Sequence, residues 1–77
     1  MKSVMIKDVF TDKDVEIKIG DWVGFKCDIE QSGKVIQIKR GLWGDIELVL
    51  ENENGFKGEY ICCETKTVVR LKDIWVD

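Results

Sequence analysis

The side chains that most often carry acid–base or nucleophilic catalysis are scarce in this 77-residue chain. It has no histidine, which is the usual general base near neutral pH. Its serines are Ser3 and Ser32, and neither stands in a Gly-x-Ser-x-Gly context that would expose a nucleophile. Carboxylates are numerous, but on an alternating strand they point into water, where nothing prepares them for acid–base work; they are Asp45, Glu47, Glu51 and Glu53. The sequence therefore predicts that the protein is not an enzyme.

The cysteines do not form the pattern of a metal site. There are three, Cys27, Cys62 and Cys63, whereas a structural zinc site takes four ligands at characteristic spacings. Neighbouring residues on a strand point to opposite faces, so Cys62 and Cys63 would not both reach one ion, and a disulfide between them would be strained. We expect no metal and no cofactor. The odd cysteine count, without a signal-peptide pattern or a membrane span, favours reduced thiols in the cytoplasm.

Tryptophans interleaved with cations are the strongest candidates for a binding site. Small barrels bind single-stranded nucleic acid by stacking bases on exposed rings and tracking the backbone with Lys and Arg. The candidate residues are Trp22, Lys26, Lys39, Arg40 and Trp43. Gly24 shares a strand face with Trp22 and Lys26 and leaves room for a flat partner. The alternative is that Leu42 and Trp43 fold back to plug an open barrel end while the lysines solubilise its rim.

Charge and aromatic content favour a protein partner over nucleic acid. The formal charge is −3, and residues 41–77 hold four Lys or Arg against eight Asp or Glu. A weakly acidic chain is poorly suited to binding duplex DNA by bulk electrostatics. Its acidic part, residues 45–64, would instead steer it towards a basic partner. Five rings are more than so small a chain can bury fully, which predicts an exposed aromatic patch; they are Trp22, Trp43, Phe56, Tyr60 and Trp75.

The elements that must position these residues are strands, because the apolar residues alternate with a period of two. Strands are expected over residues 14–19, 22–27, 34–39, 45–51, 56–63 and 67–72, with a poorly bounded opening strand within 2–10. The expected loops span residues 28–32 and 40–44, and Asn52–Gly55 carries a hairpin-turn signal. Val23, Phe25 and Cys27 share one face of the strand over 22–27, and Ile46, Leu48 and Leu50 are expected to point inwards from the strand over 45–51. In the strand over 34–39, Ile36 and Ile38 share one face and Val35 lies on the other. A short 3₁₀ turn and a final edge strand are expected to end the chain.

These expectations add up to an all-β fold, a small barrel of five to six antiparallel strands forming one domain over residues 1–77, with 1–14 as an N-terminal hairpin arm. Two motifs, Gly20-Asp21-x-Val23 and Gly33-Lys34-Val35-Ile36-x-Ile38, resemble the pattern of SH3-like barrels, including the KOW type. The ending, residues 71–76, is similar to the turn and strand that close such barrels. Among the carriers of this fold, the compact, acidic, proline-free chain looks most like small accessory proteins of tailed phages.

Two functions follow as hypotheses. The first is a non-enzymatic SH3-like module that acts by binding another protein, as a phage accessory or host-modulating factor in the host cytoplasm. The second, implied by the KOW resemblance, is an RNA or single-strand binder that uses the cations and rings named above. No membrane association is expected, and the oligomeric state is left open.

Overall fold

The computed structural model describes residues 2–8, 10–58, 61 and 63–76, and in these residues the chain is built of strands and one 3₁₀ turn. The strands are β1 (Ser3–Asp8), β2 (Lys13–Lys18), β3 (Trp22–Cys27), β4 (Ile29–Arg40), β5 (Ile46–Glu51), β6 (Lys66–Arg70) and β7 (Ile74–Val76), and the turn η1 (Leu71–Asp73) precedes β7. The expected all-β class and the 3₁₀ turn before the last strand are confirmed. The described residues hold seven strands, of which five form the larger sheet.

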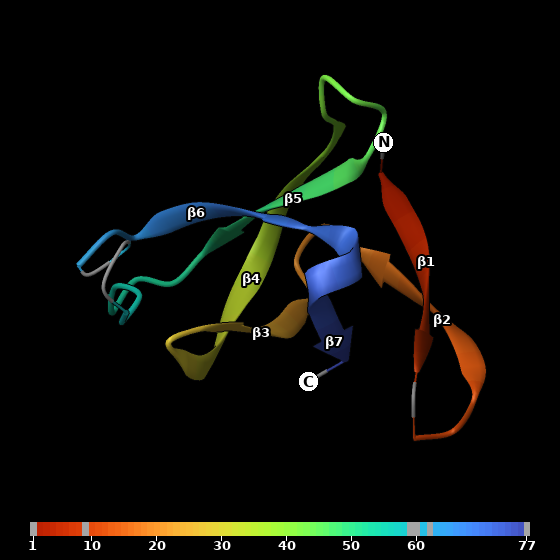
Figure 1. Cartoon of the computed structure of the whole chain (residues 1–77), viewed down its shortest axis with the longest axis horizontal. Helices are drawn as coiled ribbons and strands as arrows, with labels where there is room; N and C mark the ends of the chain where they lie inside the picture. Colours follow the sequence, from red (N-terminus) through yellow and green to blue (C-terminus); the bar gives the residue numbers. More distant parts are fainter. Residues whose placement is uncertain (1, 9, 59–60, 62, 77) are drawn as a thin grey trace.

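The strands form two antiparallel sheets (Figure 1). β1 and β2 pair in a hairpin of their own, and the other strands form a curled sheet in the order β6-β5-β4-β3-β7. The hairpin lies beside β7 in Figure 1, and Ile17 of β2 is buried in the core of the larger sheet. Within the expected arm, residues 1–14, Val4 and Ile6 are partly buried and pack against this core, so the arm lies on the larger sheet.

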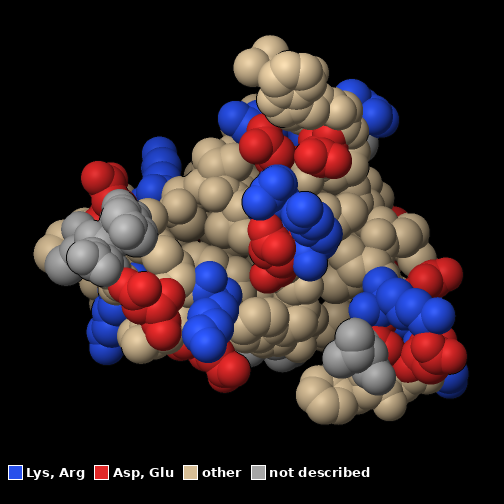
Figure 2. Space-filling view, viewed as in Figure 1, with Lys and Arg blue, Asp and Glu red and all other residues tan. Residues whose placement is uncertain are grey.

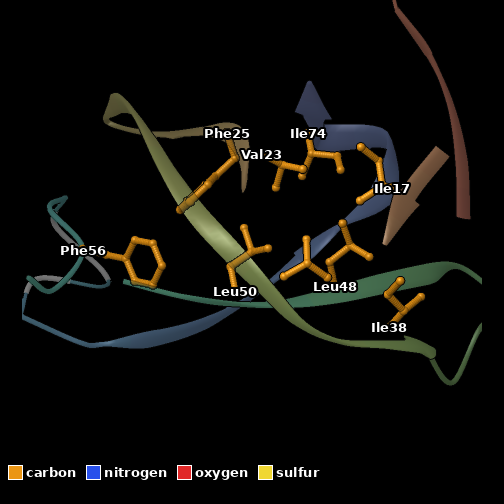
Figure 3. Packing of buried hydrophobic residues seen from close by; sticks show 9 residues of the cluster. Ile17, Val23, Phe25, Ile38, Leu48, Leu50, Phe56 and Ile74 are labelled. Carbon is orange, nitrogen blue, oxygen red and sulfur yellow. The ribbon is translucent and has the colours of Figure 1, made fainter. Parts of the chain in front are cut away.

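The core lies inside the curl of the larger sheet, as Figure 3 shows. Its buried residues are Ile17, Val23, Phe25, Val35, Ile38, Leu48, Leu50, Phe56 and Ile74. The expected inward faces of β3 and β5 are confirmed, since Val23, Phe25, Leu48 and Leu50 are all buried. Along both strands the buried side chains recur with a period of two, because only one face of each strand points into the core.

The loop expected over residues 28–32 is wrong. β4 begins at Ile29, directly after β3, and Cys27 pairs with Ile29 across a turn centred on Asp28. Asp28 adopts a φ of 66°, a left-handed conformation that aspartate tolerates better than most residues. Residues 29–32 are therefore the first part of the long strand β4.

The expected facing of the middle of β4 is also wrong. The pairing of β4 with β5 shifts between Val35 and Gln37, which marks a β-bulge at Ile36. A bulge adds one residue to one strand and exchanges the faces beyond it. As a result Val35 and Ile38 are both buried, whereas Ile36 is only half-buried.

The Gly20-Asp21 turn is what holds β4 at this bulge. Gly20 donates its backbone N–H to the carbonyl of Val35, and Val35 donates its own to the carbonyl of Asp21, at 2.7 and 2.8 Å. The carboxylate of Asp21 accepts the N–H of Lys18 at 2.8 Å, which closes the turn between β2 and β3. Gly20 has a φ of 98°, a conformation that glycine adopts without a steric penalty.

The returning strand expected over residues 56–63 is wrong for the part of it that is described. Residues 56–58, 61 and 63 are not in a strand, and β5 pairs with β6 instead. The described residues between β5 and β6 form an irregular connection, in which the Phe56 N–H donates to the carbonyl of Glu64 at 2.7 Å. Its Phe56 ring is buried against Phe25, edge to face, at a centroid distance of 5.4 Å. Phe56 thus fills part of the core from outside the strands. The expectations about Tyr60 and Cys62 fall on residues outside those described.

Candidate binding surface

The loop between β4 and β5, residues 41–45, is a projecting tip held in shape by its own backbone. Gly41 N–H donates to the carbonyl of Asp45 at 2.7 Å, and Gly44 N–H donates to the carbonyl of Gly41 at 3.1 Å. Gly44 has a φ of 85°, which explains a glycine there. Arg40 adds a hydrogen bond from Nη1 to the carbonyl of Gly44 at 3.2 Å. The loop stands at the top of Figure 1, away from the core.

The two large apolar residues of this tip are almost fully exposed. Leu42 is 99% and Trp43 92% accessible to solvent. The alternative in which they fold back to plug the barrel is therefore wrong, because the glycine-bounded turn directs them outwards. Exposed leucine and tryptophan side chains on an ordered loop gain apolar burial when a partner covers them, at a low cost in backbone entropy.

A groove of about 730 Å³ extends from the tip along β6 to the end of β3. β6 contributes its residues from Thr67 to Arg70, and β3 contributes Phe25, Lys26 and Cys27. Leu42 and Trp43 also line the groove, which makes the tip and the groove one continuous surface. We call this surface the tip–groove surface.

The structure brings two of the five candidate residues to the tip–groove surface, namely Lys26 and Trp43. Arg40 precedes the tip, and its side chain donates a hydrogen bond to the carbonyl of Gly44. Lys39 is half-buried, lies opposite Glu47 on β5 and does not line the groove. Trp22 is 49% exposed at the opposite end of β3, where it is paired with Lys34. The five residues therefore do not form a single site.

The space above Gly24 is already occupied. A Cβ atom at this position would lie 2.6 Å from Cε2 and 2.9 Å from Cδ1 of the Trp75 indole. Trp75 of β7 pairs with Gly24, so its ring lies across the outer face of β3. The flat partner inferred from the sequence is thus a tryptophan of the same chain.

Sequence reasoning did not identify the contribution of β6. Val68 is 48% exposed and lies between the exposed cations Lys66 and Arg70. Val68 lies between two cations in the sequence, and this apolar residue on the outer face of a strand could have indicated a binding surface. The strand expected over 67–72 is present as β6, which ends at Arg70 and lies at the end of the larger sheet among the described residues.

Charges of both signs surround the groove. Its lining includes the carboxylates of Asp45, Glu47 and Asp73 and the cations Lys26 and Arg70. Arg70 Nε lies 3.5 Å from the Asp73 carboxylate, an exposed ion pair. Figure 2 shows Lys and Arg interspersed with Asp and Glu over the visible face, so no single-sign patch covers it. Across the described ranges, no three His, Cys, Asp or Glu residues gather closely enough to hold a metal ion.

Comparison with protein-family models, curated proteins and solved structures finds no match to this chain. Fold and surface together define the class as a small all-β protein with an ordered apolar tip beside a groove. In the part of the chain that is described, no helix is long and apolar enough to cross a membrane.

Proposed function

We propose that the protein is a non-catalytic binding module that recognises another protein through the tip–groove surface. The observation that carries the proposal is the near-complete exposure of Leu42 and Trp43 on a loop that hydrogen bonds hold in place. Aromatic anchors of this kind, set in a rim of charges, are typical of the residues that dominate protein–protein affinity. The SH3-like resemblance and the role as a phage accessory or host-modulating factor in the host cytoplasm remain part of this proposal.

The chemistry around the tip supports a protein partner. The groove lining holds three carboxylates against two cations among the described residues, a poor match to a phosphate backbone. Its apolar part combines Trp43 and Leu42 with Val68, and burying these side chains would contribute the main favourable term of association.

The test is affinity capture from lysate of the native host with quantitative mass spectrometry. The wild-type chain is compared with Trp43→Ala and with Phe10→Ala, a matched variant that removes a ring 91% exposed outside the tip–groove surface. We expect a protein that is retained by the wild type and by Phe10→Ala and is lost with Trp43→Ala. Equal recovery with all three chains, or recovery of nothing above background, would overturn the proposal.

A second candidate, binding of single-stranded RNA, is favoured by a separate observation on β3. Trp22 and Lys26 are exposed on the same outer face, and Lys34 lies opposite Trp22 on β4. A half-exposed ring with one cation directly opposite it, and a second cation farther along the same strand face, is a surface on which a single strand can stack. Fluorescence anisotropy with a labelled single strand at about 50 mM salt tests it, because this binding mode is strongest at low salt. Binding that Trp22→Ala and Lys34→Glu both abolish would favour this candidate, and absence of binding would exclude it.

A further inference from the structure

The edge of β6 that faces away from β5 has no partner strand among the described residues. Across the groove from it lies the end of β3. β7 pairs with β3 only from Val23 to Phe25, so on that side Lys26 and Cys27 lie beyond the last paired position. An unpaired strand edge presents backbone N–H and C=O groups that a further strand can satisfy. The backbone carbonyl of Cys27 accepts a hydrogen bond from the Gln31 side chain and lies against Gly58. The edge at which an extended segment can be added is therefore that of β6.

The pairing of β5 with β6 shows which side chains suit a neighbour of β6. The outward residues of β6 are two cations around a valine, and its inward residues are half-buried. The register pairs Glu47 with Arg70, Leu48 with Val69, Val49 with Val68, Leu50 with Thr67 and Glu51 with Lys66. Because a strand presents the same faces to both of its neighbours, a segment on the free edge meets the same alternation. A segment that complements β6 is therefore acidic at the two outward positions opposite Lys66 and Arg70, and apolar at its inward positions.

The opposite wall of the groove favours the same pattern. Lys26 is exposed on the outer face of β3 and lines the groove together with Arg70. On the inner side, Phe25 is buried, and Cys27 and Ile61 pack against the core. An extended segment in the groove would thus lie between cations on its outer face and apolar side chains on its inner face.

The geometry points to strand addition at the free edge of β6, by an extended segment of another protein whose outward residues are acidic and whose inward residues are apolar. This inference rests on the proposed function and specifies how the partner's chain enters the tip–groove surface. A second copy using its own β6 is a poor occupant, because antiparallel pairing centred on Val68 places Lys66 opposite Arg70 of the other copy. Like charges directly opposite one another destabilise a strand pair, and cations on an edge are a known defence against self-pairing.

The experiment is a nuclear magnetic resonance titration of the full ¹⁵N-labelled chain with the peptide acetyl-Ser-Glu-Leu-Thr-Leu-Glu-Ser-amide. The matched control carries lysine in place of both glutamates. We expect shifts centred on the amides of residues 66–70 and 26–27, and an affinity about tenfold higher for the acidic peptide, which two cross-strand charge pairs together would supply. Absence of shifts at peptide concentrations up to about 1 mM, the weak end of specific recognition, would overturn the inference. So would equal affinity for the two peptides.

Charge reversal in the protein provides the complementary arm. Lys66→Glu combined with Arg70→Glu should invert the preference, so that the lysine peptide binds more tightly. Lys13→Glu combined with Lys18→Glu makes the same change in net charge on exposed positions of β2 and should leave the preference unaltered. If the β2 variant also preferred the lysine peptide, the peptide preference would depend on the net charge of the protein alone, and strand addition would be refuted.

Backbone pairing is tested on the wild-type chain, so the result does not depend on a variant folding. Two further peptides carry N-methyl groups on one or the other alternating set of residues, which removes the corresponding N–H donors. Loss of binding by at least one of them supports strand pairing, and unchanged binding by both refutes it. If both N-methyl peptides bind unchanged, a host protein captured through Trp43 would still support the proposed function. The two proposals can therefore fail separately.

Discussion

Replacing Phe56 by alanine tests whether the irregular connection between β5 and β6 is part of the core. Phe56 is 2% exposed, and its ring contacts Phe25 edge to face. It also covers the backbone of Gly33, where a Cβ atom would lie 3.0 Å from Cζ of the Phe56 ring. Truncation of a buried phenylalanine costs about 3–5 kcal/mol. A domain of this size has a total free energy of unfolding of roughly 4–12 kcal/mol, so Phe56→Ala removes a large fraction of it.

The assay is urea unfolding at 25 °C, followed by far-ultraviolet circular dichroism. Phe10→Ala is the matched control, because Phe10 is exposed and its removal should change the free energy of unfolding by less than about 0.5 kcal/mol. A double-mutant cycle with Phe25→Ala should return a coupling of about 0.5–1.5 kcal/mol for the ring pair. A decrease in the free energy of unfolding below about 1 kcal/mol for Phe56→Ala would refute the burial of this ring. Equal decreases for Phe56→Ala and Phe10→Ala would refute it as well.

Three further predictions concern the sheet and the tip. Gly24→Ala should destabilise the fold by about 1–3 kcal/mol, because the added Cβ would clash with the Trp75 indole. In urea unfolding, the double variant with Trp75→Ala should recover part of that loss. Val35→Ala should cost about 2 kcal/mol and Ile36→Ala clearly less, since the bulge buries the valine; equal melting temperatures would contradict the bulge. Trp43→Ala should leave the free energy of unfolding within about 0.5 kcal/mol of the wild type. It should remove the tryptophan emission that acrylamide quenches most readily. Unchanged quenching would mean that the Trp43 ring is buried in the protein.

The alternation of apolar residues was sufficient to predict the best-defined strands. β3 and β5 were expected with the correct faces inwards. The short connections on either side of β4 account for its pairing with both of them. A Gly-Asp break between two alternating runs was enough to place the turn after β2. These features are local, because the period of two depends only on which side chains must leave water.

The candidate binding site was harder to predict, because exposure is decided by neighbours distant in sequence. Whether Trp43 folds inwards depends on hydrogen bonds among Gly41, Gly44 and Arg40, and residue types alone left both outcomes open. Lys26 joins Trp43 only because the sheet curls and brings the end of β3 to the groove.

The amino-acid sequence alone determined the all-β class, the main strands and the scarcity of catalytic side chains, since all of these follow from composition and a period of two. Only the tertiary structure decided that Ile36 is bulged, that Phe56 fills the core from a loop and that β6 lies at an edge. Each of these depends on packing and pairing between segments that are far apart in the chain. A one-residue shift in register or a change of strand partner leaves the local pattern intact and exchanges which side chains meet solvent.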